Sequence, residues 1–461
     1  MSHLIALDLG TTRIKGARLD AAGRLRGVIA RDAPRVAGDD ARRESSAEAY
    51  LEAATAVRDE LLGGVSGPVT LGLASQRSSF AIWDARSGEA RTPLISWQDR
   101  RAAAWCARHA ADEPQVRRLT GLPLSPHYAG PKLATLIEED PGLGTGLADG
   151  TLRVGTLDTW LLWCWSAGRV HETDHTMAAR TLLADARSGR WHPDLLRLCG
   201  VPAAALPVVA VTCGRATALD GRITVAATIG DQPAGALAAL GDRTDAVLVN
   251  LGTGGFVLRP TGRTFETVPG YLSGPILSTT DGCLFALEGT INGAGAALDR
   301  FGTPPTDLAD ADPAPEAFAL PDDAGVGAPH WRSDLRLTLS DAAQRLDTPG
   351  QRRTVAEGIV FRVRETIDDL APVAAGLTVR LSGGLSRDPY FGAALAACLD
   401  RPVEVLEQGE QTLRGAAWLA AGRSFALADA GPLRRVAPAA EHGWLREKYP
   451  RWRAWLGRML G

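Results

Sequence analysis

Residues 4–12 read Leu-Ile-Ala-Leu-Asp-Leu-Gly-Thr-Thr, and residues 14–19 read Ile-Lys-Gly-Ala-Arg-Leu. An apolar run that ends in a small-residue turn and then resumes predicts a β-hairpin whose bend is Gly10-Thr11-Thr12. Such a turn presents backbone N–H groups without bulky side chains, and its threonines add hydroxyl donors. The stretch therefore predicts a turn that can bind one end of a phosphate chain.

The same pattern returns in the second half of the chain, where residues 246–258 read Ala-Val-Leu-Val-Asn-Leu-Gly-Thr-Gly-Gly-Phe-Val-Leu. An alignment without gaps places Asp8 on Asn250 and Gly10 on Gly252. One hairpin of this kind, taken alone, is most often a turn that binds nothing. Two copies favour a duplicated unit, with the two turns facing each other across a cleft.

Length and periodicity agree with this duplication. The 461 residues exceed one ordinary core and suit two large domains. Helical stretches alternate with apolar strands in the manner of a doubly wound α/β sheet. We expect an N-terminal domain over 1–241, a C-terminal domain over 242–425 and a C-terminal helical tail over 426–461.

The composition is that of a globular protein, with 45% hydrophobic residues, 22% charged residues and a formal net charge of −3. This balance favours no nucleic-acid partner and no anionic membrane surface. The N-terminus lacks the pattern of a signal peptide, and no apolar run approaches the roughly 20 residues that span a bilayer. The six cysteines form no C-x-x-C pair, so we expect buried thiols and a cytoplasmic protein.

The chain ends in an aromatic stripe near helical spacing, from Trp444 to Met459, with arginines between the aromatic residues. A basic amphipathic helix of this kind is compatible with a membrane surface. Packing on its own domain is the interpretation we favour.

Asp231 is the most informative acidic residue, within Ala-Thr-Ile-Gly-Asp-Gln-Pro-Ala-Gly-Ala over residues 227–236. A carboxylate between a strand and a helix is often only an N-cap. Here it comes shortly before the second hairpin, where the floor of the cleft is expected. Asp231 is thus a candidate base for an attacking hydroxyl, and Asp8 a candidate to order a magnesium shell.

A third glycine site, Leu-Ser-Gly-Gly-Leu-Ser over residues 381–386, follows an apolar strand and precedes a helix that begins near Pro389. The Gly383-Gly384 step lets a flat ligand such as adenine lie against the backbone. Alone, a Gly-Gly step indicates only a turn.

Taken in order, these motifs resemble the FGGY carbohydrate kinases, and the similarity runs from about Leu4 to Gly422. Residues 155–163 and 168–183 are most similar to the glycerol kinases of that family, as are Gln76-Arg77 and Trp97-Gln98. The resemblance implies two actin-like, ribonuclease H-like domains with an ATP-binding cleft between them. It also implies ATP and Mg²⁺ as cofactors and a small polyol or sugar as the substrate.

The resemblance also implies roles for individual residues. Asp231 is the expected catalytic base and, with Asp8, a metal ligand. Acceptor contacts are expected from Arg77, Ser78, Trp97, His127, Asp231, Gln232 and Phe256. Nucleotide contacts are expected from Thr11, Thr12, Arg13, Lys15, Gly252, Thr253, Gly254, Gly295, Asp299, Gly383, Gly384 and Asp388.

Two positions depart from the glycerol kinase pattern. Ser78 stands where those kinases have a glutamate, and His127 stands where they have a substrate-facing tyrosine. Loss of a charged acceptor from a polyol site weakens the case for glycerol and favours a longer polyol or a ketose.

Two alternatives stay open. Within the same fold, a pentulose kinase such as one for xylulose is favoured by Lys15 and by Trp-Gln-Asp-Arg-Arg over residues 97–101. From another class, an actin-like ATPase or nucleotide sensor would need no acceptor-side residues such as Arg77 and Trp97. The sequence leaves the sugar, any regulator and a homodimer undecided.

Overall fold

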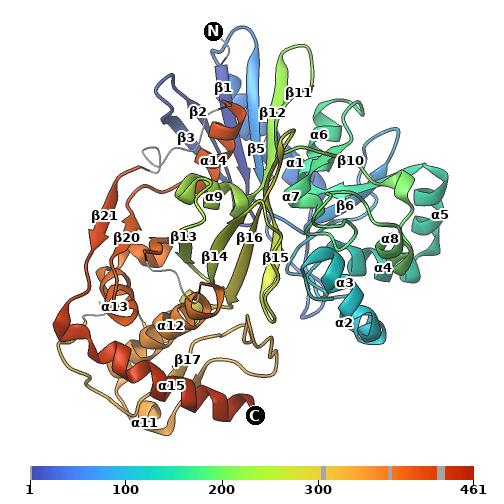
Figure 1. The fold of residues 1–461 in the computed structure, drawn as a ribbon. Coiled ribbons are helices and arrows are strands. Elements are labelled where there is room, and N and C mark those ends of the chain that lie inside the picture. Colours follow the sequence, from blue (N-terminus) through green and yellow to red (C-terminus); the bar gives the residue numbers. More distant parts are fainter. Residues whose placement is uncertain (1–2, 303–307, 372–375, 423–430) are drawn as a thin grey trace. The chain divides into compact units, whose positions relative to one another are not determined.

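A computed structural model describes residues 3–302, 308–371, 376–422 and 431–461, drawn as a ribbon in Figure 1. These residues form two compact units, and each unit takes segments from distant parts of the chain. The first contains the described residues of 3–238, 274–285 and 410–422, and the second those of 239–273, 286–409 and 431–461.

The first unit is built on a mixed six-stranded sheet in the order β11-β12-β5-β1-β2-β3. Strands β12, β5 and β1 are mutually parallel, whereas β1, β2 and β3 form an antiparallel meander and β11 pairs antiparallel with β12. The strand bounds are β1 His3–Leu9, β2 Arg13–Leu19, β3 Leu25–Asp32, β5 Val69–Ser75, β11 Cys213–Ala218 and β12 Ile223–Gly230.

Two helices cover opposite faces of this sheet, α1 (Ala47–Leu62) and α14 (Gln411–Ala420). A Cβ atom at Gly16 would meet Leu61 of α1, and a Cβ atom at Gly72 would lie 2.3 Å from the backbone oxygen of Ala416 in α14. The small residues in the strands therefore let both helices pack closely on the sheet.

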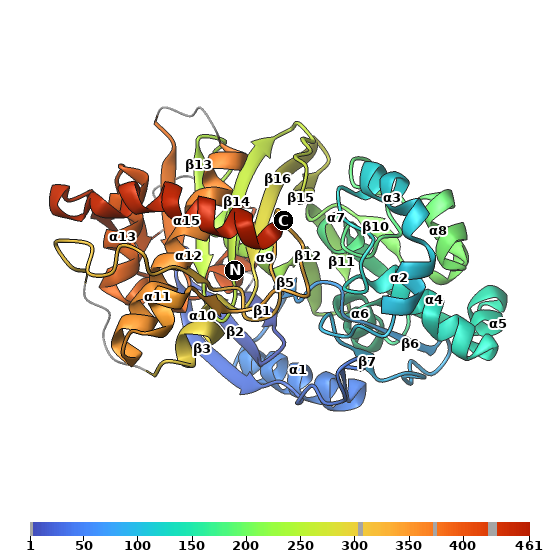
Figure 2. The ribbon, with the colours of Figure 1, turned by 90° about the horizontal axis from the view of Figure 1, so that it is seen from below.

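A second layer of the first unit is a four-stranded sheet, β4-β7-β6-β8, with a group of short helices beside it. Figure 2 shows α2, α3, α4, α5 and α8 gathered next to β6. The strand bounds are β4 Glu44–Ser45, β6 Phe80–Asp84, β7 Leu94–Ile95, β8 Leu152–Thr156, β9 Glu172–Asp174 and β10 Val208–Ala210. The helix bounds are α2 Ala103–Arg108, α3 Glu113–Thr120, α4 Ala129–Glu139, α5 Pro141–Asp149, α6 Leu157–Trp165, α7 His175–Ala178, α8 Pro193–Cys199 and α9 Asp231–Leu240.

The second unit is built on a seven-stranded sheet in the order β15-β16-β14-β13-β19-β20-β21, in which residues 274–285 of β15 and β16 cluster with the first unit. The strand bounds are β13 Ala246–Leu251, β14 Gly255–Gly262, β15 Leu272–Thr279, β16 Gly282–Ile291, β17 Ala319–Leu320, β18 Thr338–Leu339, β19 Thr378–Ser382, β20 Val403–Leu406 and β21 Leu433–Val436. The helix bounds are α10 Ala294–Asp299, α11 Asp341–Gln344, α12 Thr348–Leu370, α13 Pro389–Leu399 and α15 Trp444–Leu460.

Helix α15 buries its aromatic stripe in the core of the second unit. Tyr449 and Trp452 belong to the same buried cluster as Phe361 of α12, and the ring centroids of Trp452 and Phe361 lie 5.6 Å apart. The packing interpretation of the terminal stripe is therefore confirmed. Among the described helices, none has both the length and the apolar character needed to cross a bilayer.

Both hairpins form as predicted. In the first, Asp8 pairs with Lys15 across β1 and β2, and in the second, Asn250 pairs with Phe256 across β13 and β14. The expected extent of the second domain needs correction, because residues 410–422 lie in the first unit. The reason is that the buried face of α14 packs on β1 and β5 of the first sheet. The expected helical tail also contains a strand, β21, that pairs with β20.

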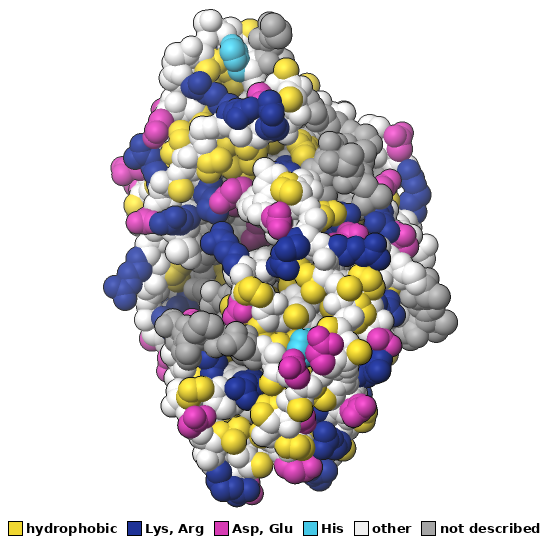
Figure 3. Space-filling view, turned by 90° about the vertical axis from the view of Figure 1, so that its left-hand side faces the viewer, with side chains coloured by type: hydrophobic (Ala, Val, Ile, Leu, Met, Phe, Trp, Pro, Cys, Tyr) yellow, Lys and Arg dark blue, Asp and Glu magenta, His cyan; other side chains and the backbone are white. Residues whose placement is uncertain are grey.

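Figure 3 shows one face of the molecule, on which basic and acidic side chains are interspersed with apolar ones. Among the residues drawn in colour there, no large patch of a single charge stands out.

Candidate active site

Three parallel strands of the first unit end at the same edge of the sheet. Ser75 at the end of β5 pairs with Leu9 of β1 on one side and with Gly230 of β12 on the other. This register places Asp8, near the end of β1, and Asp231, directly after β12, at one edge. The carboxyl edge of parallel strands is where open α/β sheets bind ligands.

Arg77 follows β5 at this edge and lies beside Asp231. Its Nε atom is 3.7 Å from Oδ1 of Asp231, with the arginine side chain 11% exposed and the aspartate side chain 36% exposed. A Cβ atom at Gly230 would lie 2.7 Å from Cδ of Arg77, so the absence of a side chain at Gly230 makes room for the guanidinium stem. The predicted base and the predicted acceptor-binding arginine are therefore neighbours.

Asp231 is the first residue of α9, and its backbone is fixed from two sides. The N–H of Gly230 donates to Oγ1 of Thr176 at 2.8 Å, and Oγ1 of Thr412 donates to the backbone oxygen of Asp231 at 3.3 Å. Oδ1 of Asp231 accepts the N–H of Gln232 at 2.9 Å. The side-chain oxygen of Gln232 is buried and has no hydrogen-bond partner among the described residues. Such an acceptor is costly unless a ligand or water satisfies it.

Asp8 sits in an environment that disfavours its charged form. Loss of solvation and the neighbouring Asp231 carboxylate together raise the pKa of Asp8 to about 7, although Lys15 opposes the shift. Two carboxylates at close range attract a cation to the space between them.

Trp97 contacts the Gly10-Thr11-Thr12 turn. Its indole Nε1 donates to Oγ1 of Thr11 at 2.8 Å. Its ring also lies against His127, with centroids 5.5 Å apart. Trp97 and His127, which are both predicted to contact the acceptor, are therefore adjacent.

His127 is surrounded by cations. Burial lowers the pKa of His127 well below its ordinary value, and the charges of Lys132, Arg180, Arg77 and Arg100 lower it further. The imidazole is therefore neutral at physiological pH and offers one N–H donor and one acceptor.

The hydroxyl of Ser78 is hydrogen-bonded within the protein. The residue is fully buried, and Oγ donates to the backbone oxygen of Arg180 at 3.0 Å. Its φ of 65° is in the left-handed region, which a non-glycine residue rarely adopts. Ser78 therefore supports the backbone of Arg180, and its acceptor contact stays a prediction.

The remaining candidates on the first hairpin differ in exposure. Thr12 is exposed at the turn. The side chain of Arg13 is 61% exposed, and its Nε atom lies 3.6 Å from Oδ1 of Asp32. Nζ of Lys15 donates to both carboxylate oxygens of Glu410, at 2.9 and 2.8 Å. A phosphate that reaches Lys15 must therefore share it with Glu410.

In the second unit, the other Gly-Thr turn is closed tightly. The N–H of Gly252 donates to the oxygen of Gly254 at 2.8 Å, and the N–H of Gly295 donates to the oxygen of Thr253 at 2.9 Å. A Cβ atom at Gly295 would lie 2.3 Å from the oxygen of Gly252, so helix α10 begins against the turn only because residue 295 is glycine. The predicted nucleotide-binding glycines of this turn are brought together.

The Gly383-Gly384 step lies beside the same turn. Gly383 has a φ of 93°, and a Cβ atom there would lie 2.2 Å from the oxygen of Leu251, whereas a Cβ atom at Gly384 would meet nothing within 4 Å. The carboxylate of Asp388 caps α13 by accepting the N–H of Tyr390 at 3.0 Å. The other two candidates of this unit are Asp299, the last residue of α10, and Phe256, half-buried on β14.

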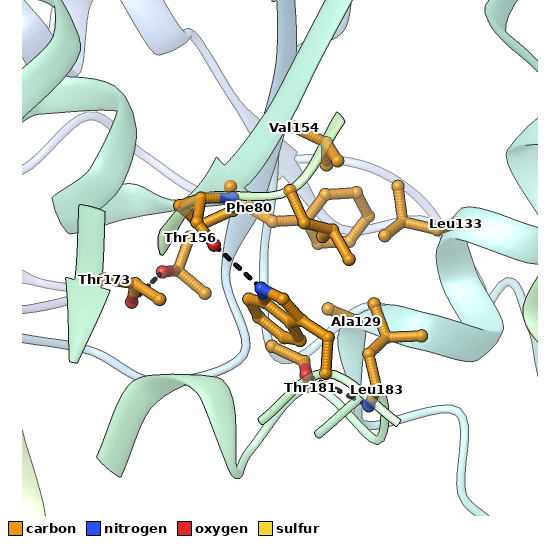
Figure 4. Close-up of a pocket in the computed structure, with 12 residues that line it drawn as sticks. Phe80, Ala129, Leu133, Val154, Thr156, Thr173, Thr181 and Leu183 are labelled. Carbon is orange, nitrogen blue, oxygen red and sulfur yellow. Dashed lines mark hydrogen bonds between the residues drawn. The ribbon is translucent and has the colours of Figure 1, made fainter. Parts of the chain in front are cut away.

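An apolar cavity in the first unit lies apart from these candidates. Figure 4 shows it between Phe80 of β6, Val154 of β8, Leu133 of α4 and Leu183. None of the residues predicted to bind acceptor, nucleotide or metal is among its lining residues. We therefore assign the cavity to the core of the helical layer.

Sequence reasoning missed several residues that support the site, namely Gln76, Ser79, Thr176, Glu410 and Thr412. Gln76 directly follows β5 and precedes Arg77, and this position after a strand was the local signal that could have marked it as a supporting residue. The others reach the site from segments far away in the sequence, and no local pattern marks them.

Family models match this chain over nearly its whole length. The model of the N-terminal domain of the FGGY family of carbohydrate kinases matches residues 3–248, and that of the C-terminal domain matches residues 247–423. The chain belongs to the FGGY family of carbohydrate kinases. It is an ATP-dependent kinase of a small sugar or polyol.

Similar FGGY proteins include a glycerol kinase of Methylobacterium nodulans, 35% identical over 86% of this chain and 85% of the relative. A glycerol kinase of Xanthobacter autotrophicus is 32% identical over 91% of this chain and 90% of the relative. Among solved structures, Plasmodium falciparum glycerol kinase with ADP has a TM-score of 0.88 at 21% identity, covering 99% of this chain and 98% of that one. Xylulose kinase of Lactobacillus acidophilus has a TM-score of 0.87 at 18% identity, covering 100% and 98%. The two-domain actin-like fold is thereby confirmed.

Proposed function

We propose that this kinase transfers the γ-phosphoryl group of ATP to a hydroxyl of a small polyol or ketose, with Asp231 as the catalytic base. The observation that carries the proposal is the meeting of Asp8, Arg77 and Asp231 at the carboxyl edge of β1, β5 and β12. One carboxylate beside a cationic hydrogen-bond donor suits a hydroxyl that must be both held and deprotonated.

In the proposed reaction, Arg77 donates a hydrogen bond to the acceptor and Asp231 accepts the proton of the attacking hydroxyl. The new bond joins that oxygen to the γ-phosphorus as the bond to the β,γ-bridging oxygen breaks, and ADP leaves. The unpartnered oxygen of Gln232 would accept from a second hydroxyl of the acceptor. Most of the rate gain then comes from positioning and charge neutralisation.

Magnesium fits this site. Within the described residues no group of three or more metal-ligating side chains exists, so a dedicated protein cage is not formed there. Mg²⁺ usually takes only one or two carboxylates together with water and phosphate oxygens. Asp8 and Asp231 would supply those carboxylates, and a bound Mg²⁺ neutralises charge on the phosphates.

Among small polyols and sugars, the site favours some acceptors over others. Of the side chains predicted to face the acceptor, only Asp231 carries a carboxylate, while neutral His127 and the indole of Trp97 form one wall. The glutamate that glycerol kinases have at position 78 would be a second charged acceptor, and its absence places a longer polyol or a ketose ahead of glycerol. A xylulose-type pentulose is the second candidate, favoured by Lys15 and by Trp-Gln-Asp-Arg-Arg over residues 97–101.

On the nucleotide side, the turn at residues 10–12 and the turn at residues 252–254 would each hold phosphate oxygens through backbone N–H groups and hydroxyls. Gly384, where a Cβ atom would meet open space, would lie against the adenine or ribose. We place the enzyme in the cytoplasm, where ATP is available, and leave a homodimer as a further possibility to be measured.

An ADP-release assay coupled to a reporter enzyme tests the proposal across glycerol, erythritol, xylitol, xylulose and ribulose. We expect acceptor-dependent ADP release, greatest with a four- or five-carbon acceptor. Equal ADP release with and without every acceptor would instead support an actin-like ATPase. A strong preference for glycerol would contradict the proposed acceptor class but not the kinase.

A further inference from the structure

Four side chains of the first unit form a closed ring of hydrogen bonds, which we call the Trp97 ring. Nε1 of Trp97 donates to Oγ1 of Thr11 at 2.8 Å, and that hydroxyl donates to Oε1 of Gln76 at 3.0 Å. Oγ of Ser79 donates to the same oxygen at 2.9 Å, and the backbone N–H of Trp97 donates to Oγ of Ser79 at 3.0 Å. The ring starts and ends on Trp97.

Donors and acceptors balance around the ring. Each of the two hydroxyls accepts once and donates once, and the Gln76 oxygen accepts twice. The amide nitrogen of Gln76 points instead toward the oxygen of Gly10, at 3.4 Å, and Tyr50 donates to that oxygen at 2.8 Å. Gln76 and Ser79 are 4% and 0% exposed, so the bond between them is shielded from water, whereas Thr11 and Trp97 are only partly buried. The buried part of the network holds Gln76 and Ser79 in one arrangement, and a ligand that covers Trp97 can order the partly exposed part.

Two members of the Trp97 ring contact different substrates in the function proposed above: Trp97 contacts the acceptor, and Thr11 contacts the nucleotide. Trp97 faces the acceptor side, where its ring lies 5.5 Å from that of His127. Thr11 lies at the tip of the turn between β1 and β2, which is the first phosphate turn. No other residue lies between them, because the indole nitrogen bonds the threonine hydroxyl directly.

We propose that Gln76 and Ser79 are positioning residues that lock Trp97 to the first phosphate turn, so that acceptor binding and nucleotide binding strengthen each other. The inference rests on the proposed roles of Trp97 and the turn. An acceptor that immobilises Trp97 also immobilises Thr11, and the nucleotide then binds to a turn that is already ordered. By linkage the effect is reciprocal: ATP tightens acceptor binding by the same factor.

Trp97→Phe tests the proposal, because it keeps an aromatic wall for the acceptor and removes only the indole N–H. The affinity for a non-hydrolysable ATP analogue is measured by calorimetry, first without acceptor and then with the best acceptor of the panel. We expect about a three- to tenfold loss of analogue affinity without acceptor, in the range of one hydrogen bond. We also expect the acceptor to improve analogue affinity less in the variant than in the wild type.

Trp165→Phe is the matched control. Nε1 of Trp165 donates to Oγ1 of Thr55 at 2.9 Å, which is the same kind of bond at a place outside the site. This variant should retain both affinities. Thr11→Ser keeps the hydroxyl and should retain the wild-type response to Trp97→Phe, whereas in a Thr11→Val background Trp97→Phe should have almost no further effect on analogue affinity.

Ser79→Ala removes the hydroxyl that accepts from the backbone N–H of Trp97 and donates to Gln76. This variant should also bind the ATP analogue more weakly than the wild type. Should that variant fold poorly in thermal melts, Trp97→Phe carries the test alone. The inference is overturned if Trp97→Phe changes only the acceptor affinity and leaves analogue affinity at the wild-type value. Failure of the proposed function would look different, since no acceptor would then be phosphorylated by the wild type.

Discussion

The guanidinium of Arg77 and the carboxylate of Asp231 lie 3.7 Å apart, between Nε and Oδ1, at the carboxyl edge of the first sheet. The distance is too long for a direct hydrogen bond and short enough for a strong electrostatic interaction. A hydroxyl that enters this gap can accept from the arginine and donate to the aspartate at once. In the proposed mechanism the pair thus forms the point at which the acceptor hydroxyl is aligned.

Gly230→Ala should displace Arg77 without removing it, because the new Cβ atom would lie 2.7 Å from Cδ of the arginine. We expect KM for the acceptor to rise about tenfold, while the affinity for an ATP analogue stays near the wild-type value. Steady-state kinetics and calorimetry measure the two quantities. Gly221→Ala is the control, since a Cβ atom there meets nothing within 4 Å. An unchanged acceptor KM in Gly230→Ala would contradict the role of Arg77.

The neighbouring glycines of the third glycine site should respond differently to alanine. Gly383→Ala places a Cβ atom 2.2 Å from the oxygen of Leu251 at a φ of 93°, so thermal stability should fall by several degrees. Gly384→Ala should retain stability, because its Cβ atom meets no protein atom, and should instead weaken ATP binding. Unchanged ATP affinity in Gly384→Ala would argue that the nucleotide does not lie against this step.

Lys132 should make stability depend on pH. Burial lowers the pKa of Lys132 to about 7, and its Nζ donates to the backbone oxygen of Ser96 at 2.8 Å. Because the unfolded chain binds the proton more tightly than the native protein between about pH 7 and 10.5, the contribution of Lys132 to stability improves as pH rises through that window. Lys132→Met removes this dependence and should raise the free energy of unfolding at pH 7 by a few kcal/mol.

Urea unfolding at pH 7 and 9.5 measures the free energy of unfolding of the wild type and of Lys132→Met. The difference between the two proteins should be smaller at the higher pH. Lys448→Met provides the contrast. That lysine is equally buried, but Nζ lies 2.8 Å from Glu357 and 3.2 Å from Asp312. Its loss leaves buried carboxylates without their partner and should destabilise the protein. A Lys132→Met variant that is less stable than wild type at pH 7 would contradict the prediction that the buried lysine lowers stability at this pH.

Ser78→Glu should not create an acceptor-binding carboxylate. Ser78 is fully buried with its hydroxyl on the backbone of Arg180, so a glutamate there would bury a charge in a packed site. We expect a loss of several kcal/mol in stability, compared with about 1 kcal/mol for Ser78→Ala. Ser66→Glu at an exposed position should cost little. Normal stability together with improved glycerol phosphorylation in Ser78→Glu would show that the side chain reaches the acceptor.

The parts of this site that the sequence predicts are those determined by local chemistry. The hairpin bend at residues 10–12 and the strand-to-helix position of Asp231 depend on neighbours within a few residues, and both form as expected. The orientation of Ser78 depends on a carbonyl 102 positions away, and the bond from Trp97 to Thr11 spans 86 positions. Contacts at such separations are set by topology, which periodicity does not reveal.

The return of residues 410–422 to the first unit is a further long-range feature. Helix α14 is amphipathic by sequence, but its pattern does not state which sheet it covers. The small residues that receive it, such as Gly72, are meaningful only once the two segments are seen together.

The most direct test of the account is the turnover of Asp231→Asn in the ADP-release assay with the best acceptor. The variant keeps the size of the side chain and removes the proton acceptor, so kcat should fall about a hundredfold or more while calorimetry still detects binding of an ATP analogue. Turnover near the wild-type value would contradict Asp231 as the catalytic base.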